Sequence, residues 1–134
     1  MTASFHVGAV LHWEGFEFDD GTAKNKYFVV LGAKPRQNYL VVIATSQPRN
    51  RSYKPGCHAQ EGYYHIPEGG KDFFRKDTWL LLMECLVVRP SEIVKLDLDG
   101  RVRTVGTLRD QLANAIRNCL RQLEDVSQAQ LELL

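Results

Sequence analysis

The stretch KNKYFVVLGAKPRQNYLVVIATSQ, residues 24–47, holds two apolar runs joined by a basic connection, and it ends on two hydroxyl side chains and an amide. The runs FVVL and LVVI are rich in β-branched and aromatic residues, which favours strands. They show little alternation between apolar and polar residues, so we expect both faces of each strand to be covered. Antiparallel strands over 26–32 and 39–45 in a closed barrel would satisfy this pattern.

Further short apolar runs are separated by Gly, Pro, Asn and Asp, which is typical of a many-stranded antiparallel domain. The predicted strands cover residues 7–13, 26–32, 39–45, 78–83 and 85–88. The segment VKLDLDGRVRTV, residues 94–105, alternates leucines and valines with charges around Asp99-Gly100, which predicts a hairpin with a two-residue turn.

Residues 107–125 carry apolar side chains at helical spacing, with Thr107 as the expected N-cap and Asp110 at the capping-box position. We therefore predict a helix docked on the sheet. The fold class that follows is mainly β (α+β), an antiparallel barrel with a C-terminal helix. Residues 126–134 would extend this helix, fray, or meet a partner chain.

The length of 134 residues fits one domain over 1–134. The start of the chain lacks a basic segment followed by a long apolar core, and no apolar run approaches the roughly 18 residues of a membrane helix. We expect a cytoplasmic protein without membrane contact. The three cysteines are widely spaced, so no disulfide framework is indicated, and we expect Cys85 and Cys119 to fill core space.

Positive charge gathers in the middle of the chain. The net charge is -4 over residues 1–23, +7 over 24–76 and -2 over 77–134, which sums to the net +1 of the whole chain. Clustered basic residues suit a polyanion, and a solvated surface gives the same pattern. The long connection over 48–76 is predicted to be functional or mobile, as long loops in compact domains usually are.

If the strands 26–32 and 39–45 are antiparallel neighbours, Lys26 lies beside Thr45 and Ser46 on one rim. An ammonium group and hydroxyl donors around a groove can hold a phosphodiester and stabilise a pentacovalent transition state. The alternative is a strand that ends in turn-forming residues. We expect the nearby cations to bind nucleic acid with the site; they are Lys24, Arg49, Arg51 and Lys54.

The long connection also carries His58 and His65, candidates for proton transfer, and Tyr63 and Tyr64, candidates for stacking on bases. Exposed loop histidines without a role are the alternative. Cys57, His58 and His65 lack a fourth ligand at a recognised spacing, so we predict no metal site and no cofactor.

The order of these motifs resembles the MazF/PemK family of toxin ribonucleases from bacterial toxin-antitoxin modules. The resemblance rests on the ordered series VGAVLHW, KYFVVLG, VIATSQ, KDTWLLLMECLVV and VRTVGTLRDQLANAIRNCL, within residues 5–123. It implies an SH3-like barrel, with Thr45 and Ser46 at the family's hydroxyl pair and Lys26 where the family has a catalytic arginine. Here Lys26-Tyr27 stands in place of Arg-Pro.

The resemblance further implies a homodimer, an antitoxin protein as partner, and RNA as substrate. The first hypothesis is thus a metal-independent endoribonuclease that cleaves single-stranded RNA, with Lys26, Thr45 and Ser46 stabilising the transition state and His58 or His65 transferring protons. The second is a non-catalytic barrel that binds nucleic acid or a protein partner. A third, weaker one is a barrel that poisons another protein, as relatives of this fold act on a topoisomerase.

Overall fold

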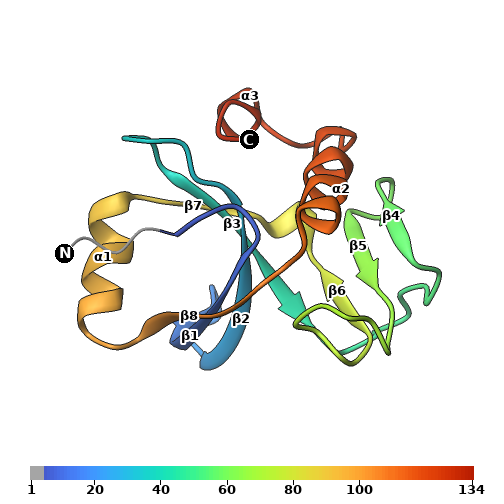
Figure 1. The fold of residues 1–134 in the computed structure, drawn as a ribbon, viewed down its shortest axis with the longest axis horizontal. Helices are drawn as coiled ribbons and strands as arrows, with labels where there is room; N and C mark the ends of the chain where they lie inside the picture. Colours follow the sequence, from blue (N-terminus) through green and yellow to red (C-terminus); the bar gives the residue numbers. More distant parts are fainter. Residues whose placement is uncertain (1–4) are drawn as a thin grey trace.

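The computed structural model describes residues 5–134, and within them one antiparallel sheet of eight strands carries three α-helices (Figure 1). The elements are β1 Ala9–Glu17, β2 Ala23–Gly32, β3 Tyr39–Thr45, β4 Gly56–His58, β5 Tyr63–Ile66, β6 Thr78–Leu80, the 3-10 helix η1 Leu82–Glu84, β7 Leu86–Val88, α1 Pro90–Leu98, β8 Val102–Thr107, α2 Asp110–Arg121 and α3 Gln128–Leu131. The strand order is β4-β5-β6-β3-β2-β1-β8, and β7 pairs with β3. The predicted fold class, mainly β with a C-terminal helix, is confirmed.

Two apolar clusters cover the two faces of the central strands. Alternate residues of β2 and β3, such as Phe28 and Val41, pack on one face, while Val29 and Val42 pack on the other with α2. These residues are fully buried. Covered faces on both sides explain why FVVL and LVVI do not alternate with polar residues.

The hairpin predicted over 94–105 is wrong, because its first half belongs to helix α1. Pro90 begins this helix, where its fixed φ is preorganised and its missing N–H costs nothing. Gly100, at φ 74°, ends it: its N–H donates to the Asp97 carbonyl, and the Arg101 N–H donates to the Leu96 carbonyl. This pair of bonds is a Schellman motif, so the glycine that indicated a hairpin turn terminates a helix instead.

Helix α1 packs between the two strands β7 and β8 (Figure 1). Strands β7 and β8 do not pair with each other within residues 5–134, and Figure 1 shows α1 at the end of the molecule between them. Its Ile93 is fully buried in the same cluster as Val88 of β7 and Val102 of β8. The helix therefore encloses the apolar interior where the strand ladder stays open.

The helix predicted over 107–125 exists but begins later, as α2 at Asp110. Thr107 is the last residue of β8, and Arg109 is the N-cap, without a side-chain capping bond. The N–H of Arg109 instead donates to the Asp72 carboxylate at 2.9 Å. A carboxylate distant in sequence thus takes the place of the predicted local cap.

The end of the chain is packed onto the sheet. A capping box of Ser127 and Gln130 starts α3, and Leu133 and Leu134 are buried in the cluster beneath α2. Gly32 of β2 makes room for this contact, because a Cβ atom there would overlap the Leu133 carbonyl oxygen.

The long connection over 48–76 contains the hairpin β4–β5, and a disulfide joins Cys57 of β4 to Cys119 of α2. The expectation that Cys119 only fills core space is therefore corrected, while the free Cys85 does pack against the core. Disulfides are rare in reducing compartments, so this bond gives no support to the predicted cytoplasmic location. That location stays a prediction. None of the helices in residues 5–134 has the length and apolar composition of a membrane span.

Candidate nucleic-acid interface

The start of β2 and the end of β3 lie side by side, as the sequence predicted. Tyr27 pairs with Ala44 in the antiparallel ladder, which sets Lys26 next to Thr45. Lys26, Thr45 and Gln47 line two adjoining pockets, one on either side, and we call these three residues the ridge. The Thr45 hydroxyl oxygen accepts the Gln47 N–H at 3.1 Å, so its hydrogen remains available to a ligand.

The first of the two, the basic pocket, has a volume of about 460 Å³. Beside the ridge, its wall includes Ile43 and Leu81. Four cationic and two acidic side chains line it: Lys24, Lys26, Arg49, Arg51, Asp20 and Glu84. Hydrogen bonds from the Thr22 hydroxyl and N–H lower the pKa of Asp20 below its usual value. The excess of cations still favours an anionic ligand.

A strained turn holds two of these cations in place. Arg49 and Asn50 have φ of 39° and 67°, a region that non-glycine residues rarely adopt. The turn is closed by Arg51, whose N–H donates to the Pro48 carbonyl at 2.7 Å and whose Nη1 donates to the Gln47 carbonyl at 3.0 Å. The Trp79 indole N–H anchors the following residue by donating to the Ser52 carbonyl at 2.9 Å.

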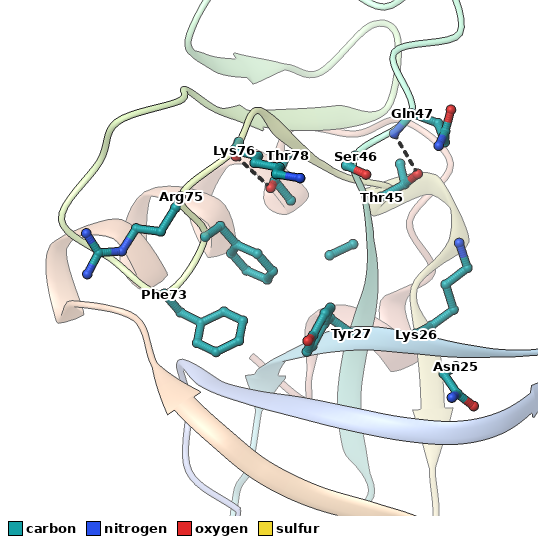
Figure 2. A pocket seen from close by; sticks show the side chains of 12 residues that line it. Asn25, Lys26, Tyr27, Thr45, Ser46, Gln47, Phe73, Arg75, Lys76 and Thr78 are labelled. Carbon is teal, nitrogen blue, oxygen red and sulfur yellow. Dashed lines mark hydrogen bonds between the residues drawn. The ribbon is translucent and has the colours of Figure 1, made fainter.

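The second pocket, the aromatic pocket, has a volume of about 400 Å³ and lies on the opposite face of the strands. Tyr27, Phe73 and Phe74 form its apolar wall, and Ser46 and Thr78 place hydroxyl groups at it. In Figure 2 the Lys26 side chain extends toward Thr45 and Gln47, whereas the rings of Tyr27 and Phe73 lie together away from it. The ridge therefore separates the basic pocket from a pocket with an aromatic wall, which Arg75 and Lys76 also line.

Two carboxylates fix the loop that carries Phe73 and Phe74. Asp72, which is 7% exposed, accepts the Arg109 N–H at 2.9 Å and its Nε–H at 3.0 Å. Asp77 accepts the Glu68 N–H at 3.1 Å and bonds His65 Nε2 at 2.9 Å. The loop is thus tied to the start of α2 and to β5, so its aromatic side chains are preorganised.

The two candidate histidines do not reach the ridge. His65 is 1% exposed and bonded to Asp77, and its ring lies 5.0 Å from that of Trp79. His58 Nε2 bonds the Lys54 carbonyl at 2.7 Å, and its ring stacks on Tyr63. Neither lines the basic or the aromatic pocket.

Three of the other predicted nucleic-acid-binding residues also line neither pocket. Tyr63 is buried, with its hydroxyl oxygen accepting the Ser52 N–H, and burial raises the pKa of Tyr64, which packs against the core. Lys54 is exposed but lines neither pocket. Sequence reasoning missed Tyr27 and Phe73 as the aromatic surface; the signal was an aromatic pair, residues 73–74, next to two cations within the basic middle of the chain.

Among residues 5–134, no group of three or more His, Cys, Asp or Glu side chains is placed to hold a metal ion. Comparisons of this chain with protein-family models, with curated proteins and with solved structures found no match.

Proposed function

We propose that this chain is an endoribonuclease of a toxin-antitoxin module that cleaves single-stranded RNA without a metal, with the scissile phosphate on the ridge. The observation that carries the proposal is that Lys26 and Thr45 lie side by side on neighbouring strands, on the ridge between a basic and an aromatic pocket. The resemblance to MazF/PemK toxins supports it, and extends the proposal to a homodimer and an antitoxin partner.

The chemistry is an attack of the ribose 2′-hydroxyl oxygen on the adjacent phosphorus, which builds negative charge on the phosphoryl oxygens. The 2′-hydroxyl loses its proton, a 2′,3′-cyclic phosphate forms, and the P–O5′ bond breaks to release a protonated 5′-hydroxyl. Lys26 would offset that charge, and the Thr45 hydroxyl would donate a hydrogen bond to the same oxygens. A lysine acts as a point charge and lacks the planar fork of arginine, so it holds the phosphate less specifically. The basic pocket would hold the neighbouring phosphates.

The placement of the histidines sets the expected rate. A positioned general acid or base contributes roughly 10²- to 10⁴-fold to such reactions. Because neither His58 nor His65 lines the ridge pockets, the proposed site lacks an imidazole for proton transfer. We therefore expect slow cleavage, with proton transfer through solvent, and no loss of cleavage in the His58→Ala variant.

The test is incubation of purified protein with single-stranded RNA in the presence of a chelator, with analysis of the product ends. The proposal expects a 2′,3′-cyclic phosphate on one fragment and a 5′-hydroxyl on the other. Lys26→Ala and Thr45→Ala should each abolish cleavage. Lys95→Ala, which changes an exposed lysine of α1 outside both pockets, is the matched control and should cleave as the unaltered chain does.

A second candidate function is binding of single-stranded RNA without cleavage. The position of both histidines away from the ridge favours it. In the same assay this candidate predicts RNA binding that weakens with salt and leaves the RNA intact. Cleavage that persists in the Lys26→Ala, Thr45→Ala double variant would reject the ridge as the catalytic site.

A further inference from the structure

We infer that the aromatic pocket is a subsite for one unpaired nucleobase of the RNA strand whose phosphate lies on the ridge. This inference rests on the proposed function, since it places the base beside that phosphate site. It adds a recognition element: the site would select single-stranded RNA by taking a base out of its stack.

The two halves of the site come from consecutive residues. Lys26 and Tyr27 are neighbours on β2, and successive side chains of a strand point to opposite faces. Lys26 lies on the ridge and lines both pockets, whereas Tyr27 lines only the aromatic pocket, beside Phe73 and Phe74. A nucleotide that straddles the ridge would meet cations with its phosphate and aromatic rings with its base.

The aromatic surface is accessible and shaped for a flat ring. Tyr27 is 41% exposed, a large value for an aromatic side chain on a central strand. The rings of Tyr27 and Phe73 have centroids 5.4 Å apart and planes inclined by 63°. They form a corner whose faces a base can contact by stacking, and stacking tolerates any base because each has a π face.

Polar groups at the pocket can contact the edge of such a base. Ser46 offers a hydroxyl, and the Thr78 hydroxyl donates to the Lys76 carbonyl at 3.0 Å, which leaves its oxygen as an acceptor. The arrangement of an apolar wall with a few polar groups is that of ligand pockets in general. A base within a duplex has both faces stacked and cannot enter.

Gly106 leaves space for the Phe73 ring at this pocket, in addition to the hydrogen bonds that fix the loop. A Cβ atom on Gly106 of β8 would lie 2.5 Å from Cδ1 of Phe73 and 3.3 Å from its Cβ. The φ of Gly106 is not in the left-handed region, so the residue is needed for space and not for its backbone conformation. A glycine inside a strand often marks such a close approach.

The test compares two short single-stranded RNA oligonucleotides of equal length, one with all bases and one in which every base is replaced by an abasic residue. Affinity is measured by fluorescence anisotropy for the unaltered chain, for Tyr27→Leu and for Tyr53→Leu. Tyr53 is the matched control, because it is 58% exposed and lines neither pocket. A third oligonucleotide carries 2-aminopurine, whose fluorescence is quenched when it stacks on an aromatic ring.

The inference expects Tyr27→Leu to weaken binding of the base-bearing strand by about 5- to 150-fold, the range for loss of one stacking contact, and to leave the abasic strand unaffected. It expects quenching of 2-aminopurine by the unaltered chain and by Tyr53→Leu. Gly106→Ala should reproduce the loss by displacing the Phe73 ring while every pocket side chain remains. Circular dichroism of each variant confirms that it is folded.

The failures of the two proposals are distinguishable. Equal affinity for both strands, with no effect of Tyr27→Leu and no quenching, would overturn the base subsite while the phosphate site stands. Absence of binding to either strand would overturn both.

Discussion

Removal of the Lys26 ammonium should flatten the dependence of RNA affinity on salt. Four cationic side chains line the basic pocket, namely Lys24, Lys26, Arg49 and Arg51. Each that meets a phosphate releases counterions, and for single strands the slope of log K against log salt is about -0.7 per contact. Four contacts give a slope of about -2.8, so affinity should fall about 50-fold between about 50 and 200 mM salt.

The Lys26→Ala variant retains three of these contacts. Its slope should be about -2.1, which corresponds to about an 18-fold fall in affinity over the same range. Fluorescence anisotropy with a labelled single-stranded RNA at several salt concentrations measures both slopes, and Lys95→Ala should match the unaltered chain. The Glu84→Gln variant should bind about threefold more tightly, because it removes a carboxylate that repels phosphate across the pocket in a medium close to water.

Two results would refute this reasoning. A slope near zero for the unaltered chain would show that phosphates are not held by these cations. Parallel lines for the unaltered chain and for Lys26→Ala would show that the ridge lysine does not meet a phosphate.

Three further predictions concern the scaffold. The disulfide joins residues 62 apart, so Cys57→Ser should lower the free energy of unfolding by about 4 kcal/mol in the chain-entropy estimate, seen as a lower urea midpoint; a midpoint equal to that of the unaltered oxidised chain would contradict it. Gly32→Ala should destabilise the chain and speed amide exchange at residues 133–134, because its methyl group would overlap the Leu133 carbonyl. Gly70→Ala should cost little, because a Cβ atom there would meet only the Pro67 carbonyl oxygen, at 3.7 Å; equal effects of the two substitutions would contradict the packing. Burial raises the pKa of Cys85, so at pH 8 a smaller fraction of this thiol is ionised than of a small thiol in solution. Alkylation of Cys85 by iodoacetamide at pH 8 should therefore be slower than alkylation of the small thiol, and it should accelerate above pH 9. Equal rates for Cys85 and the small thiol would count against this prediction.

The geometry of the ridge was accessible from the sequence because it depends on one antiparallel pairing. Once β2 and β3 are neighbours, the start of one must lie beside the end of the other, and Lys26 must approach Thr45. The same reasoning could not tell that Thr45 lines both pockets whereas Ser46 lines only the aromatic pocket, since that depends on where the strand alternation ends.

Other features depend on contacts between residues distant in sequence. Asp99-Gly100 fits both a hairpin turn and a helix end, and the burial of Ile93 between β7 and β8 favours the helix. The disulfide requires β4 to reach α2 across 62 residues, and no spacing rule predicts that. The aromatic pair at residues 73–74 is visible in the sequence, but its position at the pocket depends on the hydrogen bond from Arg109 to Asp72, which local sequence does not predict.

The assignment of histidines shows the same limit. His65 lies on β5, one strand beyond β6 from the ridge, and the nearer strand carries Trp79 in the paired position. Its imidazole is hydrogen-bonded to Asp77 and so helps to fix the loop. A histidine in a basic connection was a reasonable candidate for proton transfer, but its partner was determined by strand pairing.

The most direct measurement is a map of backbone amide shifts in the NMR spectrum on addition of a short single-stranded RNA. The account predicts the largest changes at residues 24–27, 45–47 and 73–78, with little change along α1 and β7. Changes confined to α1 and β7, or none at RNA concentrations where anisotropy reports binding, would contradict it.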